Sequence, residues 1–228
     1  MKKISIAIDG PAASGKSTTA RLVAQSLNYL HIDTGAMYRA ITLKVLDGRM
    51  DINDRQTIEE VAHSTAIRLI GENGGNKVLL DGVDVTRRIR KPNVTQAVST
   101  ISSYRGVREV MVREQQRMAL QGGVVLEGRD IGTVVLPNAE LKIFMSASVE
   151  ERARRRKKDL AQDGIEADEK ELARQIEARD RSDSMRETSP LRRAEDAIDL
   201  DTSDMTVEAQ VDFIVRRAEK IIHEAEPV

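Results

Sequence analysis

A glycine-rich run between an apolar segment and a helical segment constrains the fold of this chain more than any other feature. The pattern G-x-x-x-x-G-K-[ST] follows the apolar segment 4–8 directly, in the strand-then-helix setting that the pattern requires. Glycines let consecutive backbone N–H groups curl around a phosphate, and the dipole of the following helix adds positive charge. The run therefore predicts a nucleoside triphosphate site. Its residues are Gly10, Pro11, Ala12, Ala13, Ser14, Gly15, Lys16 and Ser17.

Two side chains of this loop carry chemistry as well as shape. Lys16 is expected to reach the β- and γ-phosphates of the nucleotide as a mobile positive charge. The hydroxyl of Ser17 is expected to bind Mg²⁺, which prefers oxygen ligands. Magnesium is therefore predicted as a cofactor, with Ser17 as its ligand.

The overall composition excludes several classes of protein. Among the 228 residues, 36 Lys and Arg balance 37 Asp and Glu, so we expect neither nucleic acid nor a membrane as a partner. The absence of cysteine excludes disulfides and thiolate metal sites and fits a cytoplasmic location. His31, His63 and His223 share no metal-ligand spacing, so zinc is not expected. The first apolar run breaks at Asp9, too early for a signal peptide.

Short apolar runs alternate with helical patterns along most of the chain. Such runs are typical of buried parallel strands, and a three-to-four spacing of apolar residues is typical of packed helices. The alternation predicts an α/β, three-layer P-loop NTPase fold: a five-stranded parallel sheet flanked by helices, with ligands at the carboxyl ends of the strands. The expected strands are 4–8, 29–32, 124–126, 141–145 and 197–200, and the expected helices are 17–27, 36–47, 105–120, 149–160, 169–179 and 207–225.

Residues 63–104 break this alternation. Two apolar segments, 66–70 and 77–80, lie on either side of the turn-rich segment 71–76, which is typical of an antiparallel hairpin. We therefore expect a small α+β insert here.

A second break, at residues 157–191, gathers arginines and acids around Gly164 and Pro190 and indicates a helical arm with a loop. We expect a single domain, 1–228, with its core at 1–62 and 105–228. A monomer is expected, because the chain's own helices use both faces of the sheet.

The phosphate-binding loop alone does not distinguish a kinase from a GTPase or a motor ATPase. A GTPase needs an N-K-x-D motif, but the pair Asn76-Lys77 continues as Val78-Leu79, which does not favour that class. A kinase for a sugar or a shikimate-like acceptor remains an alternative. A nucleotide-controlled binding protein without catalysis also keeps such a loop.

Polar segments follow the second and third predicted strands. Thr34 is suited to donate to an acceptor phosphate and Arg39 to hold it with two hydrogen bonds, although a helix cap and a solvated arginine would look the same in sequence. Arg129 and Asp130, between glycines after the third strand, are typical of a ligand-contacting loop. Both segments are expected at the same edge of the sheet as the phosphate-binding loop.

The arm adds a run of cations that has two interpretations. A solvated helix face would carry such a run, partly neutralised by neighbouring acids. Alternatively, arginines on a hinged arm stabilise the charge that spreads over a transferred phosphoryl group. The cations are Arg152, Arg154, Arg155, Arg156, Lys157, Lys158, Arg174, Arg179, Arg181 and Arg186.

An ordered set of segments closely resembles the motifs of bacterial cytidylate kinases, and the resemblance covers nearly the whole chain. It implies transfer of the γ-phosphate of ATP to CMP or dCMP, an adenylate-kinase-like core, a closing lid and an acceptor-binding insert. The segments are G-P-A-A-S-G-K-S at 10–17, D-T-G-A-M-Y-R at 33–39, V-R-E at 107–109, G-R-D-I-G-T-V-V at 128–135, I-E-A-R-D-R-S-D-S-M-R at 176–186 and S-P-L at 189–191.

The resemblance also implies roles for individual positions. It implies that residues 10–18, Thr18 included, bind ATP together with Arg152 and Arg156, and that Lys16, Arg129, Arg179 and Arg186 are catalytic. The acceptor phosphate would be held by Thr34, Arg39, Arg129 and Arg186, the cytosine by Ser99, Arg108 and Asp130, and the sugar by Arg179 and Asp183. Family members often carry Ser at the position of Thr34, and the hydroxyl is retained.

The chemistry of cytosine fits the roles of Arg108 and Asp130. Cytosine offers an amino donor at C4 and an acceptor at N3, so Asp130 can accept and Arg108 can donate. Uracil reverses this pattern and would leave buried polar groups unpaired.

Overall fold

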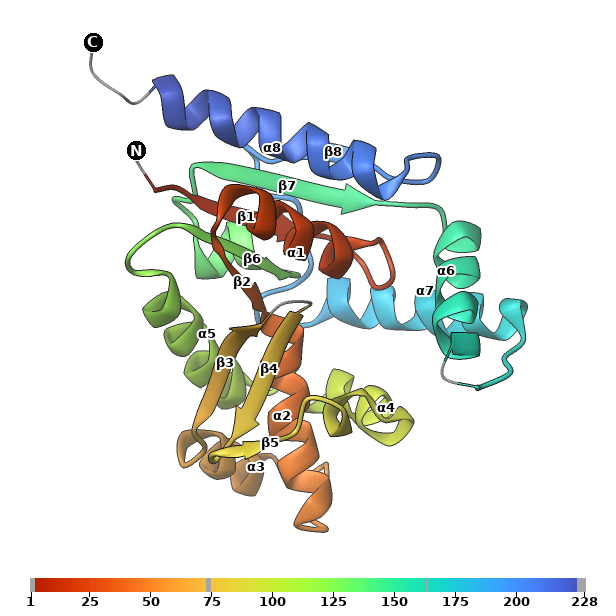
Figure 1. Cartoon of the computed structure of the whole chain (residues 1–228). Coiled ribbons are helices and arrows are strands. Elements are labelled where there is room, and N and C mark those ends of the chain that lie inside the picture. Colours follow the sequence, from red (N-terminus) through yellow and green to blue (C-terminus); the bar gives the residue numbers. More distant parts are fainter. Residues whose placement is uncertain (1–2, 73–74, 163, 225–228) are drawn as a thin grey trace.

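The computed structural model describes residues 3–72, 75–162 and 164–224 of the chain. Its centre is a sheet of five strands in the order β2-β6-β1-β7-β8, and each neighbouring pair is parallel (Figure 1). This arrangement confirms the predicted fold class. The strands are β1 (Ser5–Asp9), β2 (Leu30–Asp33), β6 (Val124–Gly128), β7 (Leu141–Ser146) and β8 (Ile198–Asp201).

Both faces of this sheet are buried, because side chains along a strand point alternately to opposite faces. Ile6 and Ile8 of β1 pack in a cluster with helices α1 (Lys16–Leu27) and α8 (Val207–Glu224). Ala7 belongs to the cluster on the other face, which includes the end of helix α5 (Arg105–Ala119) and the π-helical turn η2 (Ile131–Val135). The sheet is therefore the middle of three layers.

A third hydrophobic cluster surrounds helix α2 (Thr34–Asp47). This helix lies beside the main sheet (Figure 1). Strands β3 and β4 contribute to the cluster, together with α3, α4 and α5, and β5 extends their antiparallel sheet in the order β3-β4-β5. The elements that lie beside α2 are α3 (Arg55–His63), β3 (Ile67–Glu72), β4 (Gly75–Leu80), β5 (Val83–Asp84), the 3₁₀ turn η1 (Arg88–Arg90) and α4 (Pro92–Ile101).

Helices α6 (Val149–Gln162) and α7 (Glu169–Met185) form an arm that projects from the main body (Figure 1). A small apolar cluster that includes Ala153, Leu172 and Ile176 holds the two helices together. Within the described segments, none of the helices is both long enough and apolar enough to cross a membrane.

The elements outside the main sheet differ most from the predictions. The sequence patterns predicted neither α3 nor α4. Helix α7 continues past its predicted end at Arg179 to Met185. The predicted antiparallel hairpin is confirmed by strands β3 and β4, but its turn is shorter than the predicted segment 71–76, because Gly71 pairs with Asn76 in the β3–β4 ladder. Residues 73–74 of that turn, and Ala225 at the end of the last predicted helix, lie outside the described residues.

Candidate active site

The loop between β1 and α1 has the backbone shape that its glycines predict. Gly10 and Gly15 have φ angles of 150° and 94°, and Ala13 between them has a φ of 59°. A Cβ atom on Gly10 would lie 2.0 Å from the backbone oxygen of Met145, so no other residue fits there without a shift of β7. The chain therefore turns tightly at the end of β1 and enters α1 at Lys16.

Lys16 lies inside this loop rather than in solvent. It is 5% exposed, and its Nζ donates to the backbone oxygen of Pro11 at 2.6 Å and to Oγ of Ser14 at 3.1 Å. Burial lowers the pKa of Lys16 well below its ordinary value, and the charge of Arg129 lowers it further, whereas Glu127 opposes the shift. A polyphosphate in the loop would place negative charge next to the buried ammonium of Lys16 and so stabilise its charged form.

Ser17 contacts a carboxylate at the end of the neighbouring strand. Its Oγ donates to Oε2 of Glu127 at 2.6 Å, and Oε1 of Glu127 lies 3.0 Å from Nε2 of His31. Glu127 pairs with Ile8 in the β1–β6 register, which places it beside the loop. Hydroxyl and carboxylate oxygens suit Mg²⁺. The described residues contain no cluster of three or more His, Asp or Glu that could hold a metal ion by itself.

Thr34 and Arg39 lie at the same edge of the sheet, on helix α2. Oδ1 of Asp33 caps this helix by accepting from the backbone N–H of Ala36 at 2.9 Å, and Oδ2 accepts from Nη2 of Arg39 at 2.8 Å. Thr34 donates through Oγ1 to the backbone oxygen of Glu127 at 2.7 Å. Asp33 is therefore a helix cap, but Arg39 is paired rather than freely solvated.

Arg108 and Asp130 form a buried pair, although they come from α5 and from the loop after β6. They are 2% and 4% exposed, and Nη2 of Arg108 donates to Oδ2 of Asp130. The guanidinium of Arg108 lies 5.2 Å from the centre of the Tyr38 ring. Burial raises the pKa of Tyr38 to about 12, so its hydroxyl is neutral near pH 7. The structure thus brings together the two residues expected to face the cytosine.

Asp183 of α7 is a second buried acid, and it lies beside two of the arginines that were expected to hold the acceptor phosphate. Nε of Arg129 donates to its Oδ2 at 2.9 Å. Arg186 lies 3.8 Å from Asp183 and 3.9 Å from Asp130, which links the two acids. Burial disfavours ionisation of Asp183, but Arg129, Arg179 and Arg186 outweigh it and hold the pKa of this carboxyl below its usual value.

Several arginines at this site keep hydrogen-bond donors free. Burial, together with the charge of Arg129, lowers the pKa of Arg179 to about 10. Buried donors in proteins usually have partners, so unpaired ones indicate a place for an oxygen-rich ligand. Among the described residues, the buried nitrogens without a hydrogen-bond partner include Nε of Arg39, Arg108 and Arg179 and Nη2 of Arg186.

Ser99 lies on α4, where this helix meets the arm. Its Oγ is 3.4 Å from Oγ of Ser182 on α7, next to Asp183. Ser102, further along the same segment, supplies the backbone oxygen that accepts from Nη1 of Arg108 at 3.1 Å. The contact of Ser99 with a base stays a prediction.

Of the two arm arginines expected at the nucleotide, Arg152 contacts the loop directly. Its Nη1 donates to the backbone oxygen of Ala12 at 3.2 Å and to Asp180 of α7, and Asp180 also accepts from the backbone N–H of Ala12 at 3.3 Å. Arg156 is half-buried, and its charge contributes to the lowered pKa of Arg179. Thr18 is exposed at the start of α1.

Sequence reasoning assigned no role to several residues that shape the site. Arg155 donates to the backbone oxygens of Ser14 at 3.3 Å and Thr202 at 2.6 Å, which ties the arm to the loop. Glu127 carried a usable signal, since an acid lies there near the carboxyl end of the strand that precedes Arg129. His31 carried none, because its partner is distant in sequence.

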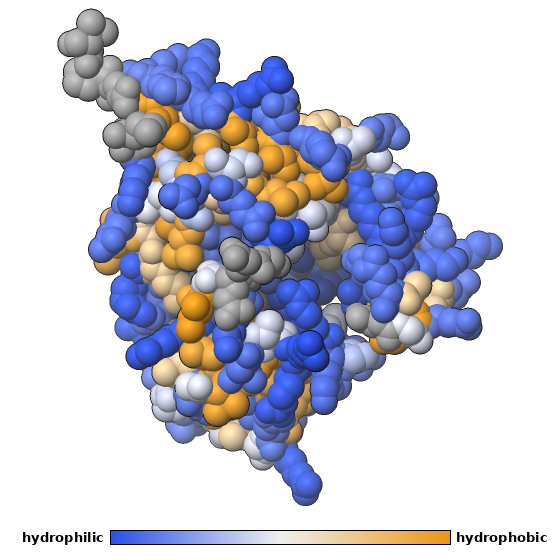
Figure 2. Space-filling model, viewed as in Figure 1, coloured by the Kyte–Doolittle hydropathy of each residue, from blue (hydrophilic) through white to orange (hydrophobic). Residues whose placement is uncertain are grey.

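Two cavities flank the converging side chains. In the space-filling view the surface is hollowed where the arm meets the rest of the molecule (Figure 2). A cavity of about 180 Å³ is lined by Ser17, Thr18, His31, Asp33 and Arg90, among others.

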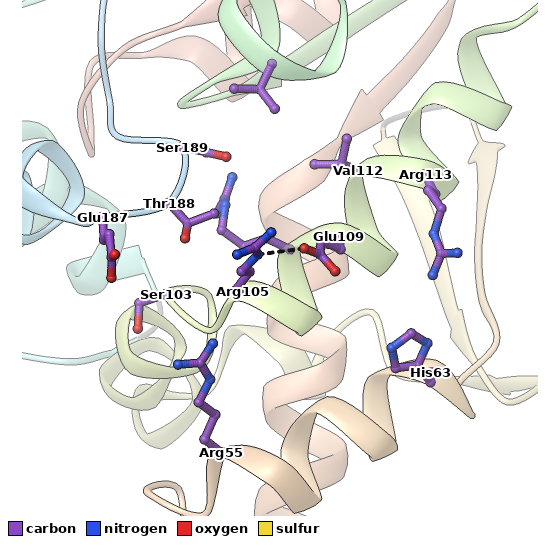
Figure 3. A pocket seen from close by; sticks show the side chains of 12 residues that line it. Arg55, His63, Ser103, Arg105, Glu109, Val112, Arg113, Glu187, Thr188 and Ser189 are labelled. Carbon is purple, nitrogen blue, oxygen red and sulfur yellow. Dashed lines mark hydrogen bonds and ion pairs between the residues drawn. The ribbon is translucent and has the colours of Figure 1, made fainter.

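A larger cavity of about 1090 Å³ shares only Arg108 with the predicted site residues. Figure 3 shows Arg55 and Arg105 at this cavity, with Arg105 paired to Glu109. The predicted site residues therefore converge at the loop and at the Arg108–Asp130 pair rather than in the larger cavity.

Comparison with known proteins agrees with this geometry. The family model for cytidylate kinase matches residues 6–220. The chain belongs to the cytidylate kinase family. A cytidylate kinase from Bacillus subtilis (strain 168) is 49% identical over 219 residues, which cover 96% of this chain and 98% of that protein. One from Desulforamulus reducens is 54% identical over 217 residues, or 94% and 96% of the two chains.

Solved structures of other kinases are more distant. The crystal structure of shikimate kinase from Bacteroides thetaiotaomicron is 13% identical at a TM-score of 0.49, with 97% of this chain and 99% of that chain covered.

Replacing Lys16 with Ala should lower kcat by roughly 10³-fold, because a preorganised charge at the transferred phosphate is lost. Steady-state ADP production measures the effect. Lys142→Ala is the matched control, since Lys142 is also buried, at 7% exposure, but pairs with Asp196. Near-normal turnover in the Lys16 variant would contradict the assigned role of the loop.

Proposed function

We propose that this protein transfers the γ-phosphoryl group of ATP to CMP or dCMP, with ADP and CDP or dCDP as products. One observation carries the proposal: a phosphate-binding loop, a group of buried arginines and the Arg108–Asp130 pair meet at one edge of the sheet. Membership of the cytidylate kinase family supports the same reaction.

On the donor side, the loop residues 10–17 are proposed to surround the phosphates of ATP, with Thr18, Arg152 and Arg156 nearby. The buried Lys16 ammonium and the backbone N–H groups of the loop fit a polyphosphate. The oxygens of Ser17 and Glu127, which meet at 2.6 Å, fit a hard cation such as Mg²⁺. When bound, Mg²⁺ would neutralise charge on the β- and γ-phosphates.

On the acceptor side, Thr34, Arg39, Arg129 and Arg186 are proposed to hold the phosphate of the nucleoside monophosphate. Their free donors support this role, since Arg39 and Arg186 each carry a buried nitrogen without a partner among the described residues. Asp33 and Asp183 already orient Arg39 and Arg129. Such pre-orientation reduces the entropy lost when the acceptor binds.

The proposed reaction is an in-line displacement. An ionised oxygen of the acceptor phosphate attacks the γ-phosphorus, and the bond from that phosphorus to the β–γ bridging oxygen breaks, so that its electron pair leaves with ADP. The attacking oxygen carries no proton, and no general base is needed. Lys16, Arg129, Arg179 and Arg186 would compensate the charge on the transferred group, and their positions provide the catalysis.

Cytosine recognition is proposed to depend on Asp130 and Arg108, with Ser99 nearby, while Arg179 and Asp183 contact the sugar. The pair is almost fully buried, so a base that offers the wrong donors and acceptors would leave charged groups unpaired. This cost would discriminate against uracil.

The surrounding elements have proposed roles as well. Residues 63–104 would form the acceptor-binding insert and residues 157–191 the lid, on a core at 1–62 and 105–228; residue 163 of the lid lies outside the described residues. The balanced charge of the chain fits action on small nucleotides rather than on nucleic acid or membranes. A cytoplasmic location is proposed from the absence of cysteine, and a monomer because the chain's own helices cover both faces of the sheet.

A panel of acceptors tests the proposed function directly. ADP release is measured with ATP and each nucleoside monophosphate, and with sugar and shikimate-like acceptors. CMP and dCMP should be the best acceptors, because the amino donor at C4 and the acceptor at N3 of cytosine match the Arg108–Asp130 pair, whereas uracil reverses this pattern. A hydroxyl acceptor that outperforms both would overturn the proposal, and ATP binding without transfer to any acceptor would favour a binding protein.

Replacing Asp130 with Asn should relax the preference for cytosine over uracil. The amide keeps the size of the side chain but can offer a donor where the carboxylate accepts. We expect a fall in kcat/KM for CMP that corresponds to a loss of roughly 1.5–3 kcal/mol of transition-state stabilisation, the range for a hydrogen bond to a charged group. The value of kcat/KM for UMP should change little or rise. The measurement is the ratio of kcat/KM for CMP to that for UMP.

The matched control for this variant is Asp180→Asn. It removes an acid from another arginine pair, that of Arg152, which lies at the loop rather than at the base. In this control, the general effect of losing an ion pair should lower kcat/KM for CMP and kcat/KM for UMP by similar factors. An unchanged CMP/UMP ratio in the Asp130 variant would remove Asp130 from base recognition.

Closure of the arm should appear in hydrogen exchange. Exchange in residues 164–185 should slow when an ATP analogue and CMP are bound together, because Arg179 and Arg186, whose buried nitrogens lack partners among the described residues, would then contact the bound ligands. Equal protection in the free and the doubly bound protein would contradict a closing lid. The sheet strands serve as the internal reference, since their exchange should not change.

A further inference from the structure

We propose that His31 is a positioning residue for Glu127, and through it for the metal-binding oxygens at Ser17. This inference rests on the donor half of the proposed function. The Nε2 atom of His31 lies 3.0 Å from Oε1 of Glu127, and the two side chains are 10% and 5% exposed. The other carboxylate oxygen, Oε2, accepts from Ser17 at 2.6 Å.

The two oxygens of Glu127 therefore have different partners. A buried carboxylate needs a donor at each oxygen, because an unpaired oxygen carries the full cost of desolvation. Ser17 satisfies the oxygen that faces the loop, and His31 satisfies the oxygen that faces away from it. Since His31 is not one of the proposed metal ligands, its contact fixes the plane of the carboxylate independently of what binds at Ser17.

The position of His31 is itself fixed by two elements. Strand β2 pairs with β6 so that His31 lies opposite Val125. Val125 comes two residues before Glu127 on β6, so the two strands bring His31 and Glu127 close together. The backbone oxygen of His31 accepts from Nδ2 of Asn76 on β4 at 2.8 Å. The β6 ladder and the side chain of Asn76 therefore hold the backbone of His31 in place beside Glu127.

The imidazole makes no other hydrogen bond among the described residues. Its Nδ1 atom is buried and has no partner there, so the contact with Glu127 is the one that orients the ring. Because the carboxylate accepts, Nε2 carries the proton. His31 also lines the cavity of about 180 Å³ beside Ser17 and Asp33, so a role at this site is distinct from packing in the core.

Two amides of different length separate positioning from packing. In His31→Gln, the side-chain nitrogen stands as many bonds from the backbone as Nε2 does and can still donate to Glu127. In His31→Asn, it stands one bond closer and corresponds to Nδ1, so it cannot reach. Leu30→Ala, at the exposed neighbouring position on β2, is the control for a change in this strand.

The experiment measures binding of ADP by calorimetry with and without Mg²⁺, in the absence of any acceptor and therefore of turnover. In the wild type, Mg²⁺ should tighten ADP binding. In His31→Asn this tightening should shrink by about 10-fold, in the range found when partners of metal ligands are removed, while binding of metal-free ADP stays unchanged. His31→Gln and Leu30→Ala should keep most of the tightening.

The outcomes distinguish this inference from the proposed function. Wild-type tightening in His31→Asn, or a full loss of it in a folded His31→Gln, would overturn the positioning role, and circular dichroism verifies folding. The calorimetric measurement uses no acceptor, so its result would still test the role of His31 if CMP were not the acceptor. An absence of tightening in the wild type would overturn both this inference and the donor half of the proposed function.

Discussion

Buried positive charge at the carboxyl edge of the sheet is the constraint on which the rest of the site depends. Lys16, Arg108 and Arg152 are each at most 5% exposed, and such charges are costly unless they are paired. The acids at positions 127, 130, 180 and 183 provide part of the compensation. The lowered pKa values of Lys16 and Arg179 show that the compensation is incomplete. Anionic substrates relieve this imbalance, so affinity for phosphate follows from the fold.

The parallel sheet brings these charges to one place. Strands β1 and β6 are neighbours, and Asp9 pairs with Gly128 where both strands end. The chain leaves β1 into the phosphate-binding loop and leaves β6 into Arg129 and Asp130. Asp9 closes the gap between them, because its carboxylate accepts from the backbone N–H groups of Ile131 at 2.8 Å and Gly132 at 2.7 Å. The two loops therefore form one rigid edge.

Periodicity predicted the core well because its strands and helices bury continuous or regularly spaced apolar residues. It missed α3, which buries only Ile58 and Ala62, and α4, whose Pro92 is a start signal within a Ser- and Thr-rich stretch. The contacts between residues of the site could not be predicted from a single sequence. Ser17 and Glu127 are 110 residues apart, and Arg129 and Asp183 are 54 apart, so only the folded topology joins them.

The end of β6 places one short segment against both of the proposed substrate sites. Glu127 faces Ser17 and the loop, Arg129 reaches Asp183 on the arm, and Asp130 pairs with Arg108 under the insert. These side chains share a backbone that β1 and β2 hold on its two sides, and the Asp9 contacts hold the loop that follows it. If the donor phosphates bind at Ser17 and the acceptor base at Asp130, as proposed, this strand end sets the distance between them. The proposed closure of the arm would then take place around a distance that the sheet already fixes.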